Sequence, residues 1–490
     1  MTATAVSLVI AFITTPLLVR WLGAERFGAV RTLADWFGHL SLLEIGLGGA
    51  IPPLIALSLG RGDAAAARRI VGAAIRAFVL VGAAVLAGGL LIGLASGRLV
   101  QVDPSLLTDL RNAAFVGLVT ALLYPLLPFQ ALLDASQRGY VIQWFSLAQS
   151  VTTAALALVL ARAGWGITGQ FIAMMAGVIV LRLGLAVAGE RLLPGSFAAA
   201  ARRPDRETVS SIRRLNISTF LFSLSGRIAL YSDNIIVAAV LGPTAVTPLF
   251  VTQRLAGIAG IQLLAVGNAS WAALAELHAL ERRDVFAQRL TELTRLVAGL
   301  AVAALVPIAA FNEPFVARWV GADAYAGDAV TLLACTNAWL MAILSLWGWC
   351  FSGTGQIQLL LKVTMISAVL NLVTSIAATK LIGVSGPLLG TLVGAGATSL
   401  WYLPLLLRRH FGVSPLGVLR AALIPVAWGI PAYFLLRFLA GRYEPRSWPA
   451  LLGAMAASAV VLLAVWWRFA LTEDERSAFR QRISALGSTR

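Results

Sequence analysis

The sequence predicts an all-α polytopic membrane protein with about fourteen transmembrane helices, arranged as two pseudo-symmetric six-helix lobes and a C-terminal helical hairpin. Of the 490 residues, 59% are hydrophobic and only 12% are charged, and the mean hydropathy is +0.85. In a bilayer the backbone polar groups can be satisfied only by helices or by a closed barrel. The apolar runs are too long and too uniform for barrel strands, so helices are expected.

The second observation is that the chain repeats itself. Short segments recur roughly 217 to 219 residues later: Leu22-Gly23 as Leu241-Gly242, Gln137 as Gln356, and Gly166-Ile167-Thr168-Gly169 as Gly383-Val384-Ser385-Gly386. The charged triplet Arg61-Gly62-Asp63 is answered by Arg282-Arg283-Asp284. Two related halves in a very apolar chain are typical of transporters whose two helical bundles rock about a central site.

Apolar runs bounded by Gly, Pro and charged residues give the expected spans. In chain order they are 1–19, 32–58, 70–94, 112–134, 144–161, 166–188, 216–240, 247–272, 295–311, 329–351, 363–379, 384–407, 416–438 and 450–467. The predicted organisation is an N-lobe over 1–188, a cytoplasmic linker over 189–215, a C-lobe over 216–407, helices 13 and 14 over 408–467, and a cytoplasmic tail over 468–490. Helices 13 and 14 fall outside the duplication, and either pack against one lobe or line a lateral lipid groove.

Basic residues between the spans indicate the orientation. With the N-terminus inside, the inner segments hold 21 Arg and Lys and the outer segments hold 10. Because cytoplasmic loops carry the excess of positive charge, both termini are expected in the cytoplasm. The first residues carry no basic side chain and run directly into an apolar stretch, which predicts a first transmembrane helix rather than a signal peptide. A misassigned start codon that trims a short basic tail is the alternative.

The net charge of +16 does not call for a nucleic-acid partner, because most basic residues sit between apolar runs, where topology accounts for them. Charge alone leaves open whether the arginines face lipid or an anionic substrate. Cys335 and Cys350 share one predicted span and are expected to be ordinary buried residues. Neither a disulfide framework nor a metal cluster is indicated, and no cofactor is expected.

Charged residues inside the spans are the candidate functional residues, because a formal charge deep in hydrocarbon costs about 2.5 to 3.5 kcal/mol. They gather near the start of each half: Asp35, His39 and Glu44 in helix 2, Arg227 and Asp233 in helix 7, and Arg254 in helix 8. Arg76 and Arg182 lie near the inner ends of helices 3 and 6, where a long side chain can snorkel to the interface.

Depth in the membrane relates these residues to one another. At a rise of about 1.5 Å per residue, Asp233 and Arg254 both lie roughly 10 Å below the outer surface, which predicts a structural ion pair or a gating contact. Glu44 and Arg227 lie roughly 18 to 20 Å deep, near the midplane. In a two-lobe transporter they could face one cavity, where the arginine would bind an anionic group and the carboxylate would exchange a proton. The alternative is a buried pair that holds the lobes together.

Helix 2 carries two further features. His39 lies four residues after Asp35, so the two side chains share one face and could carry coupling protons, the alternative being that His39 is a structural hydrogen-bond donor. Beyond Glu44, a run of glycines and the pair Pro52-Pro53 are expected to weaken and bend this helix, although small residues also permit close helix packing.

Three stretches resemble the polysaccharide biosynthesis flippases, a family within the superfamily that also holds multidrug exporters and peptidoglycan-precursor flippases. They are the opening segment from Thr15 to Gly28, which contains Arg20-Trp21-Leu22-Gly23; the segment Leu42-Leu43-Glu44-Ile45-Gly46-Leu47-Gly48 with Gly60-Arg61-Gly62-Asp63; and Tyr231-Ser232-Asp233-Asn234-Ile235-Ile236 with Leu241-Gly242. Gly166-Ile167-Thr168-Gly169 is similar to the family's inter-helix glycine turn.

This resemblance implies a flippase of the bacterial inner membrane that moves undecaprenyl-diphosphate-linked oligosaccharide repeat units for O-antigen or exopolysaccharide, with Arg227 as the candidate for the diphosphate. Arg254 and Glu44 are further candidate substrate residues, and Glu44, His39, Asp35 and Asp233 are candidates for ion coupling or gating. Membrane lipids, a polysaccharide polymerase and glycosyltransferases are the expected partners of a monomer. A cation-coupled multidrug exporter and a peptidoglycan-precursor flippase are the alternatives.

The sequence does not favour an enzyme. A membrane polymerase or glycosyltransferase would normally need a sizeable outer loop with acid, base or metal ligands, and the longest predicted outer segments are about 17 residues with no metal-spaced set. The chain also has no Gly-x-x-x-x-Gly-Lys-[Ser/Thr] loop for ATP, so transport energy would come from an ion gradient or from product removal.

Overall fold

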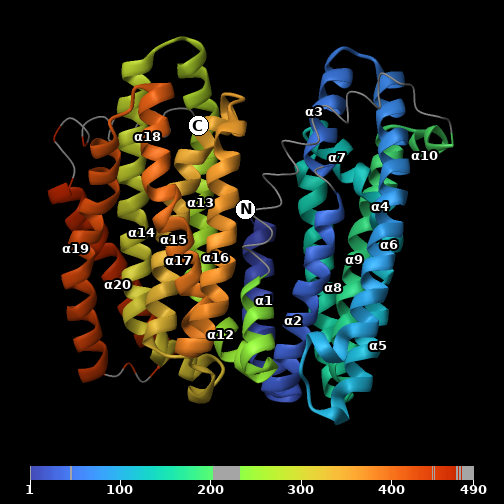
Figure 1. Ribbon diagram of the computed structural model, residues 1–490, viewed down its shortest axis with the longest axis horizontal. Helices are drawn as coiled ribbons and strands as arrows, with labels where there is room; N and C mark the ends of the chain where they lie inside the picture. Colours follow the sequence, from blue (N-terminus) through green and yellow to red (C-terminus); the bar gives the residue numbers. More distant parts are fainter. Residues whose placement is uncertain are drawn as a thin grey trace. The chain divides into compact units, whose positions relative to one another are not determined.

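The regular elements of the chain are helices, as the apolar runs predict (Figure 1). The chain divides into two compact units, Met1–Thr247 and Pro248–Arg490. A computed structural model describes residues 2–44, 47–201, 232–443 and 447–470, together with 445, 473 and 476.

In the first unit several of the predicted spans are broken into shorter helical pieces. In chain order the elements are α1 (Thr2–Leu22), α2 (Ala24–Leu40), η1 (Ser41–Glu44), α3 (Leu47–Gly60), α4 (Ala64–Leu99), η2 (Pro104–Leu106), α5 (Leu107–Gly117), α6 (Val119–Leu123), η3 (Tyr124–Leu126), α7 (Leu127–Ala135), α8 (Gly139–Arg162), α9 (Gly166–Leu192), α10 (Ser196–Ala200), the helical segment Ser232–Leu241 and η4 (Pro243–Ala245). The second span thus consists of α2, η1 and α3, and the fourth contains four pieces from α5 to α7.

The second unit has longer uninterrupted helices. After α12 (Val246–Thr252), which begins at the end of the first unit, come α13 (Arg254–Ala279), α14 (Arg283–Trp319), η5 (Ala322–Ala324), α15 (Asp328–Gly353), η6 (Ile357–Leu360), α16 (Leu361–Ile382), η7 (Gly383–Ser385), α17 (Gly386–Ala397), α18 (Ser399–Phe411), α19 (Pro415–Arg442), α20 (Trp448–Val465) and the π-helical turn η8 (Trp466–Ala470). Pro at the first or second helical position, after Ser414 and Ser447, helps to set where α19 and α20 begin.

Within the described ranges, ten helices are long and apolar enough to cross a membrane, and the bent pair Ala24–Glu44 with Leu47–Gly60 makes eleven. Val6–Leu22 and Ser232–Leu241 are shorter apolar helices. The protein is therefore an all-α, multi-pass membrane protein, and the total of fourteen spans stays a prediction.

Left-handed turns mark the internal repeat. Residues with positive φ pair at separations of 217 to 219 positions: Gly23 with Gly242, Gly62 with Glu281, Gln137 with Gly355, Gly164 with Gly383, and Gly195 with Gly412. A glycine in one half can be a glutamine or a glutamate at the equivalent position of the other half. The feature that the two halves share at these positions is therefore the backbone conformation and not the residue type. The sequence match of Arg61 with Arg282 is therefore two residues out of register, and the match of Gln137 with Gln356 is one residue out.

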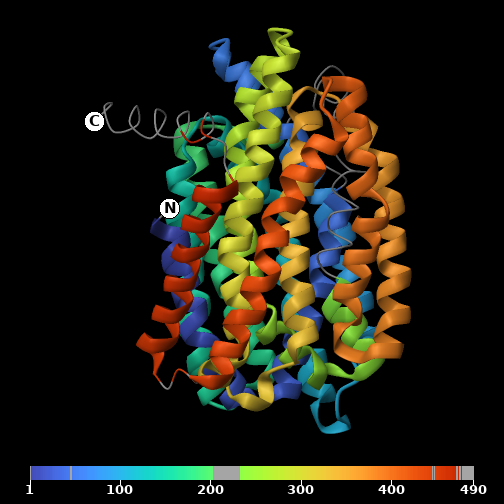
Figure 2. The same ribbon diagram turned by 90° about the vertical axis from the view of Figure 1, so that its left-hand side faces the viewer.

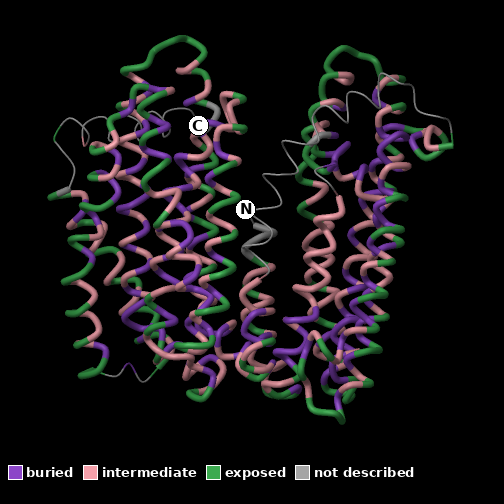
Figure 3. Tube along the Cα trace, in the orientation of Figure 1, coloured by how far each residue is buried: buried purple, intermediate pink, exposed green. Residues whose placement is uncertain are grey.

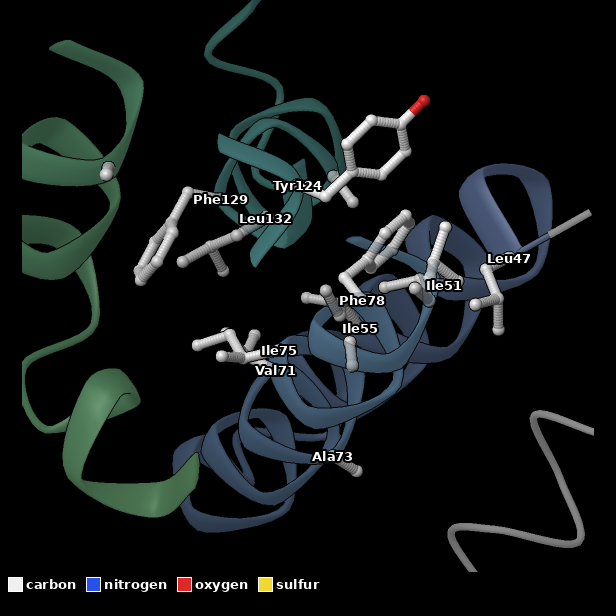
Figure 4. Packing of buried hydrophobic residues seen from close by; sticks show 14 of the residues in the cluster. Leu47, Ile51, Ile55, Val71, Ala73, Ile75, Phe78, Tyr124, Phe129 and Leu132 are labelled. Atoms are coloured by element: carbon white, nitrogen blue, oxygen red, sulfur yellow. The ribbon is translucent and has the colours of Figure 1, made fainter. Parts of the chain in front are cut away.

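An apolar core joins α3, α4 and α7 in the first unit. Ile51 and Ile55 of α3 and Phe78 of α4 are buried together with Phe129 and Leu132 of α7 (Figure 4). Burying each of these side chains contributes about 1.5 to 3 kcal/mol relative to exposure, so this cluster fixes α3, the part of the second span that follows the break, against α4.

Helices α16 and α17 of the second unit pack through small residues. On α17, Gly386, Gly390 and Gly394 recur every four residues, and a Cβ atom on any of them would overlap α16. The facing positions on α16 are Thr379, Ser375 and Asn371, also four residues apart. This matched spacing brings the two backbones close together, as small residues do between membrane helices.

Helices α19 and α20 lie beside α14 at the periphery of the second unit (Figure 2). Both expose much of their surface, including Trp428, Phe434 and Phe438 of α19 (Figure 3). Together with α14 they line an apolar pocket of about 330 Å³. A lateral lipid groove at these helices stays a prediction.

Candidate functional site

The candidate residues of helix 2 lie on a span that bends by 62° between Glu44 and Leu47. Before the bend the helix tightens into the 3₁₀ turn η1, where the Ser41 hydroxyl donates to the Gly38 carbonyl oxygen at 2.6 Å. The break falls directly after Glu44, and Gly48, Gly49, Pro52 and Pro53 all lie inside the continuous helix α3. Irregular backbone at membrane depth is tolerated where it is buried in protein or lines a cavity, so the bend is a candidate position for a site.

One polar set joins α2 to the segment Ser232–Leu241. The amide Nδ2 of Asn234 donates to Oδ2 of Asp35 at 2.7 Å. The Asp233 carboxylate is close enough to Asp35 for the two like charges to repel, and Arg31, one turn before Asp35, attracts it. Two candidate residues that are 198 positions apart in the chain are thus brought together, and Asn234, quoted above only as part of a family motif, makes the connecting hydrogen bond.

His39 contacts Asp35 through the backbone. Its ring nitrogen Nδ1 lies 3.0 Å from the Asp35 carbonyl oxygen. Because a carbonyl oxygen can only accept, Nδ1–H is the donor in this contact. A role for His39 in proton coupling stays a prediction.

A second polar set surrounds Glu44 at the bend. Its carboxylate lies against Gly48, where a Cβ atom would be 3.6 Å from Oε2. The guanidinium of Arg182 on α9 is attracted by the charge of Glu44, and its Nη1 donates to Oε1 of Gln130 on α7 at 2.7 Å. Figure 4 shows the Tyr124 hydroxyl pointing away from the apolar core. The first unit therefore supplies a cation for Glu44 from within itself.

Sequence reasoning missed Arg182, which it interpreted as a snorkelling residue. The structure extends α9 to Leu192, ten residues beyond Arg182, so this arginine lies roughly 15 Å from the helix end. This distance from the helix end is the signal that would have identified it. Arg76, by contrast, reaches the end of α10, where Nε donates to the Ala200 carbonyl oxygen and Nη2 to that of Ala201 at 2.8 Å.

The remaining candidates are placed separately. Arg254 begins α13 in the second unit, with its guanidinium 5.5 Å from the centre of the Phe250 ring. Arg227 lies outside the described residues, so its pairing with Glu44 stays a prediction. The ion pair between Asp233 and Arg254 would join residues of the two different units and likewise stays a prediction.

Two polar clusters at helix ends were not anticipated. Asp109 of α5 accepts hydrogen bonds from the backbone N–H groups of Ile167 and Thr168 at 2.7 and 2.9 Å, which closes the N-terminus of α9. In the second unit, Arg437 of α19 donates to Glu313 at 2.6 Å and to Asp328 at 2.9 Å. The first of these clusters fixes the start of α9, the helix that carries Arg182.

Fold and site define a polytopic, internally duplicated helical membrane protein with charges at a broken span. Solved structures share this fold. The structure titled "Lipid II flippase MurJ, inward closed conformation" has a TM-score of 0.69 and 12% sequence identity, and the match covers 95% of this chain and 98% of that chain. The inward-facing conformation of a multidrug resistance MATE family transporter of the MOP superfamily has a TM-score of 0.59 and 16% identity, with 87% of this chain and 95% of that chain covered. A MOP superfamily transporter from Pyrococcus furiosus has a TM-score of 0.55 and 17% identity, with 89% of this chain and 93% of that chain covered. These solved neighbours are flippases and transporters.

The family follows from the sequence itself. The profile of the family "Polysaccharide biosynthesis protein" matches residues 1–278, more than half of the chain. No curated protein matches the chain. The chain belongs to the polysaccharide biosynthesis protein family and has the fold of the MOP superfamily, which confirms the resemblance found in its motifs.

Proposed function

We propose that the protein is a flippase that moves undecaprenyl-diphosphate-linked oligosaccharide repeat units across the bacterial inner membrane by alternating access. The observation that carries the proposal is the family match, which covers the first half and reaches the beginning of the second. The fold supports it, because the solved neighbours belong to transporters and flippases. The chain would act without a cofactor and not as an enzyme, between the glycosyltransferases that build the repeat unit and the polymerase that joins it.

The charges at the bend suit this cargo. A diphosphate needs a cation in a water-accessible part of the membrane, and Arg182, which lies well inside α9 and is attracted by Glu44, is a candidate for that cation. Arg227 is the candidate from the second half, and Arg254 is a further one. An arginine binds phosphate oxygens in pairs, so these residues are suited to a diphosphate. Transport would draw on an ion gradient through Asp35, His39, Glu44 and Asp233.

A peptidoglycan-precursor flippase is the second candidate, favoured by the TM-score of 0.69 to a structure titled as a lipid II flippase. A cation-coupled drug exporter is the third, favoured by the MATE structures. Cargo distinguishes the three, because both lipid cargos carry a diphosphate whereas a drug exporter would favour an acidic, apolar cavity without buried arginines.

Proteoliposomes that contain the purified protein test the proposal. We expect an undecaprenyl-diphosphate oligosaccharide labelled on its sugar to become accessible to a quencher on the opposite leaflet, faster than in protein-free vesicles. Faster movement of a labelled lipid II would support the second candidate, and accumulation of a cationic dye the third. If none of the three cargos moves, the protein is not this kind of transporter.

Variants connect the cargo to the site. Arg227→Ala, Arg182→Gln and Glu44→Gln should each abolish polymer display in a strain that depends on this chain, with normal amounts of protein in the membrane. Arg227→Lys should be partly tolerated if a point charge suffices, and not if two paired hydrogen bonds are needed. Glu292→Gln on α14 of the second unit is the control, because it removes a carboxylate that pairs with Arg289 at 2.7 Å. Normal polymer from all three site variants would exclude these residues from the mechanism.

A further inference from the structure

The predicted span 247–272 is interrupted at a position where the equivalent span of the first repeat is continuous. α12 ends at Thr252, and α13 begins at Arg254. One repeat spacing earlier, Leu33 lies inside the uninterrupted helix α2 and is buried in an apolar cluster. The last carbonyl groups of a helix have no partner within that helix. The second repeat therefore needs a donor at this junction that the first repeat does not need.

Asn312 of α14 supplies that donor. Its amide Nδ2 donates to the Thr252 carbonyl oxygen at 2.8 Å and to the Thr331 hydroxyl oxygen at 2.9 Å. All three residues are 1% exposed. The orientation of the amide is fixed, because a flipped amide would place its oxygen against the Thr252 carbonyl oxygen. The equivalent position of the first repeat is Gly93, which has no side chain that could donate.

The hydrogen bonds continue from Asn312 to the appended helix α19. The Tyr325 hydroxyl lies 3.2 Å from the Thr331 hydroxyl and donates to Asp328 at 2.5 Å. Because the tyrosine proton is used by the carboxylate, the Thr331 hydroxyl is the donor in its contact with Tyr325. Asp328 also accepts from Arg437 of α19 at 2.9 Å. A chain of donors thus leads from the amide to one carboxylate, and each bond of such a chain strengthens the others.

The junction of α12 and α13 determines where Arg254 lies. Arg254 is the first residue of α13, and its guanidinium lies 5.5 Å from the centre of the Phe250 ring on α12. A guanidinium is attracted to the face of an aromatic ring. Because the two groups stand on opposite sides of the junction, their contact depends on how the two helices join at Thr252. A side chain that bonds a backbone carbonyl between helical segments is a recognised cause of such a break.

We propose that Asn312 is a positioning residue for cargo binding. Its amide holds the junction of α12 and α13, and the junction holds the Arg254 guanidinium in place for an anionic group of the cargo. Without the amide, the buried Thr252 carbonyl oxygen loses this donor, and Arg254 moves with the loosened junction. The role in cargo binding rests on the proposed flippase function, whereas the role of the amide at the junction does not.

Hydrogen exchange on the purified full-length protein in detergent tests the role at the junction. Asn312→Leu replaces the amide oxygen and nitrogen by methyl groups and so removes both donors. We expect exchange of the backbone amides in 250–258 to become about tenfold faster, because local opening no longer breaks this hydrogen bond. Thr331→Val removes one of the two acceptors of the amide and should give a smaller increase in the same segment. Exchange in 250–258 that is unchanged in either variant overturns the proposal.

Asn337→Leu is the matched control for these measurements. Asn337 is a buried asparagine of α15 whose Nδ2 donates to the Leu388 carbonyl oxygen of α17 at 2.8 Å. Like Asn312, it has an enclosed Oδ1 atom without a hydrogen-bond partner in the described part of the chain. The control should leave exchange in 250–258 as it is in the unmodified protein. An equal increase in Asn337→Leu and Asn312→Leu would reflect general destabilisation and would overturn the proposal.

Cargo movement in proteoliposomes tests the connection from Asn312 to Arg254. The probe is the undecaprenyl-diphosphate oligosaccharide labelled on its sugar, and the concentration that gives half-maximal movement is measured. Asn312→Leu should raise this concentration, and combining it with Arg254→Gln should raise it no further than Arg254→Gln alone, because Asn312 acts through Arg254. Losses that multiply in the combined variant would overturn the positioning role. Faster exchange in Asn312→Leu together with an unmodified protein that moves no cargo would contradict the flippase function alone.

Discussion

Asp109 and Asp328 occupy equivalent positions in the two repeats and bind different partners. They are separated by the same interval as the paired left-handed turns. Asp109 accepts from the backbone N–H and the hydroxyl of Thr168 at the start of α9, whereas Asp328 accepts from the Tyr325 hydroxyl and from Arg437. The same carboxylate closes a helix N-terminus in one half and attaches the appended helix α19 in the other.

Asp109→Asn should destabilise the first unit by about 1 to 3 kcal/mol, because an amide keeps only one oxygen for three donors and turns its own N–H groups toward them. Thermal unfolding in detergent, followed by intrinsic fluorescence, measures the loss. Asp284→Asn, in the exposed first turn of α14, is the control and should stay within about 0.5 kcal/mol of the unmodified protein. An unchanged midpoint for Asp109→Asn would show that the α9 N-terminus is held by other groups.

Arg437→Gln should loosen α19 without unfolding the second unit. Its partners Glu313 and Asp328 are 50% and 45% exposed, so solvent screens the pairs and each contributes well under about 1 kcal/mol. Hydrogen exchange in the last turns of α19 should therefore rise while the melting temperature changes little. The effect should shrink at high salt in the unmodified protein, because salt screens exposed charges. Exchange that is insensitive to both changes would mean that apolar packing alone holds α19.

Tyr325→Phe should show a pH dependence of known sign. Burial, followed by the hydrogen bond to Asp328, holds the pKa of the Tyr325 hydroxyl above its ordinary value of 10.0. A folded-state pKa above the unfolded value gives stability that is complete below the unfolded pKa and is lost as the pH rises through the folded one. The difference in unfolding free energy between the two proteins should thus be constant, at about 1 kcal/mol, up to about pH 10 and should shrink above it. Chemical denaturation at increasing pH measures this difference, and a difference that grew with pH would contradict it.

Much of the fold was predictable because membrane helices follow from local composition. The apolar runs placed the helices, and Gly23 with Gly242 revealed the duplication, since both turns need the left-handed conformation that glycine allows. The register between these landmarks was less predictable. Gly62 and Glu281 share a positive φ although the residue types differ. Aligning the two halves by their charged residues, Arg61 with Arg282, therefore gave a register that is two positions out.

The sequence was sufficient to predict which residues form the candidate site, but not which of them contact one another. The cost of burying charge identified Asp35, Glu44 and Asp233 from the sequence alone. The bond from Asn234 to Asp35 and the attraction between Arg182 and Glu44 join distant segments, and hydropathy contains no information about which helices are neighbours.

Gly28→Ala should disrupt the close contact between Gly28 of α2 and Pro243 of η4. The added methyl group would overlap the Pro243 carbonyl oxygen, and a backbone atom cannot rotate away as the end of a side chain can. Overpacking of this kind typically costs about 1 to 3 kcal/mol. We expect faster hydrogen exchange in 23–35 and 232–247 and reduced cargo movement. Gly60→Ala is the matched control, since its added methyl group meets open space. Equal exchange in the two variants would show that the contact is not close-packed.

Gly390→Ala should destabilise the α16–α17 pair, whereas Gly396→Ala on the same helix should not. A Cβ atom on Gly390 would overlap the backbone and hydroxyl of Ser375, and a Cβ atom on Gly396 meets nothing within 4 Å. Alanine favours a helix over glycine by about 1 kcal/mol, so the control should melt at the same temperature or slightly higher. Gly390→Ala gains the same helix propensity but loses about 1 to 3 kcal/mol to the overlap, so it should melt at a lower temperature.

Because both changes add one methyl group to the same helix, the sign of the difference in melting temperature separates the effect of packing from that of helix propensity. Equal melting temperatures would mean that α16 and α17 can move apart without cost.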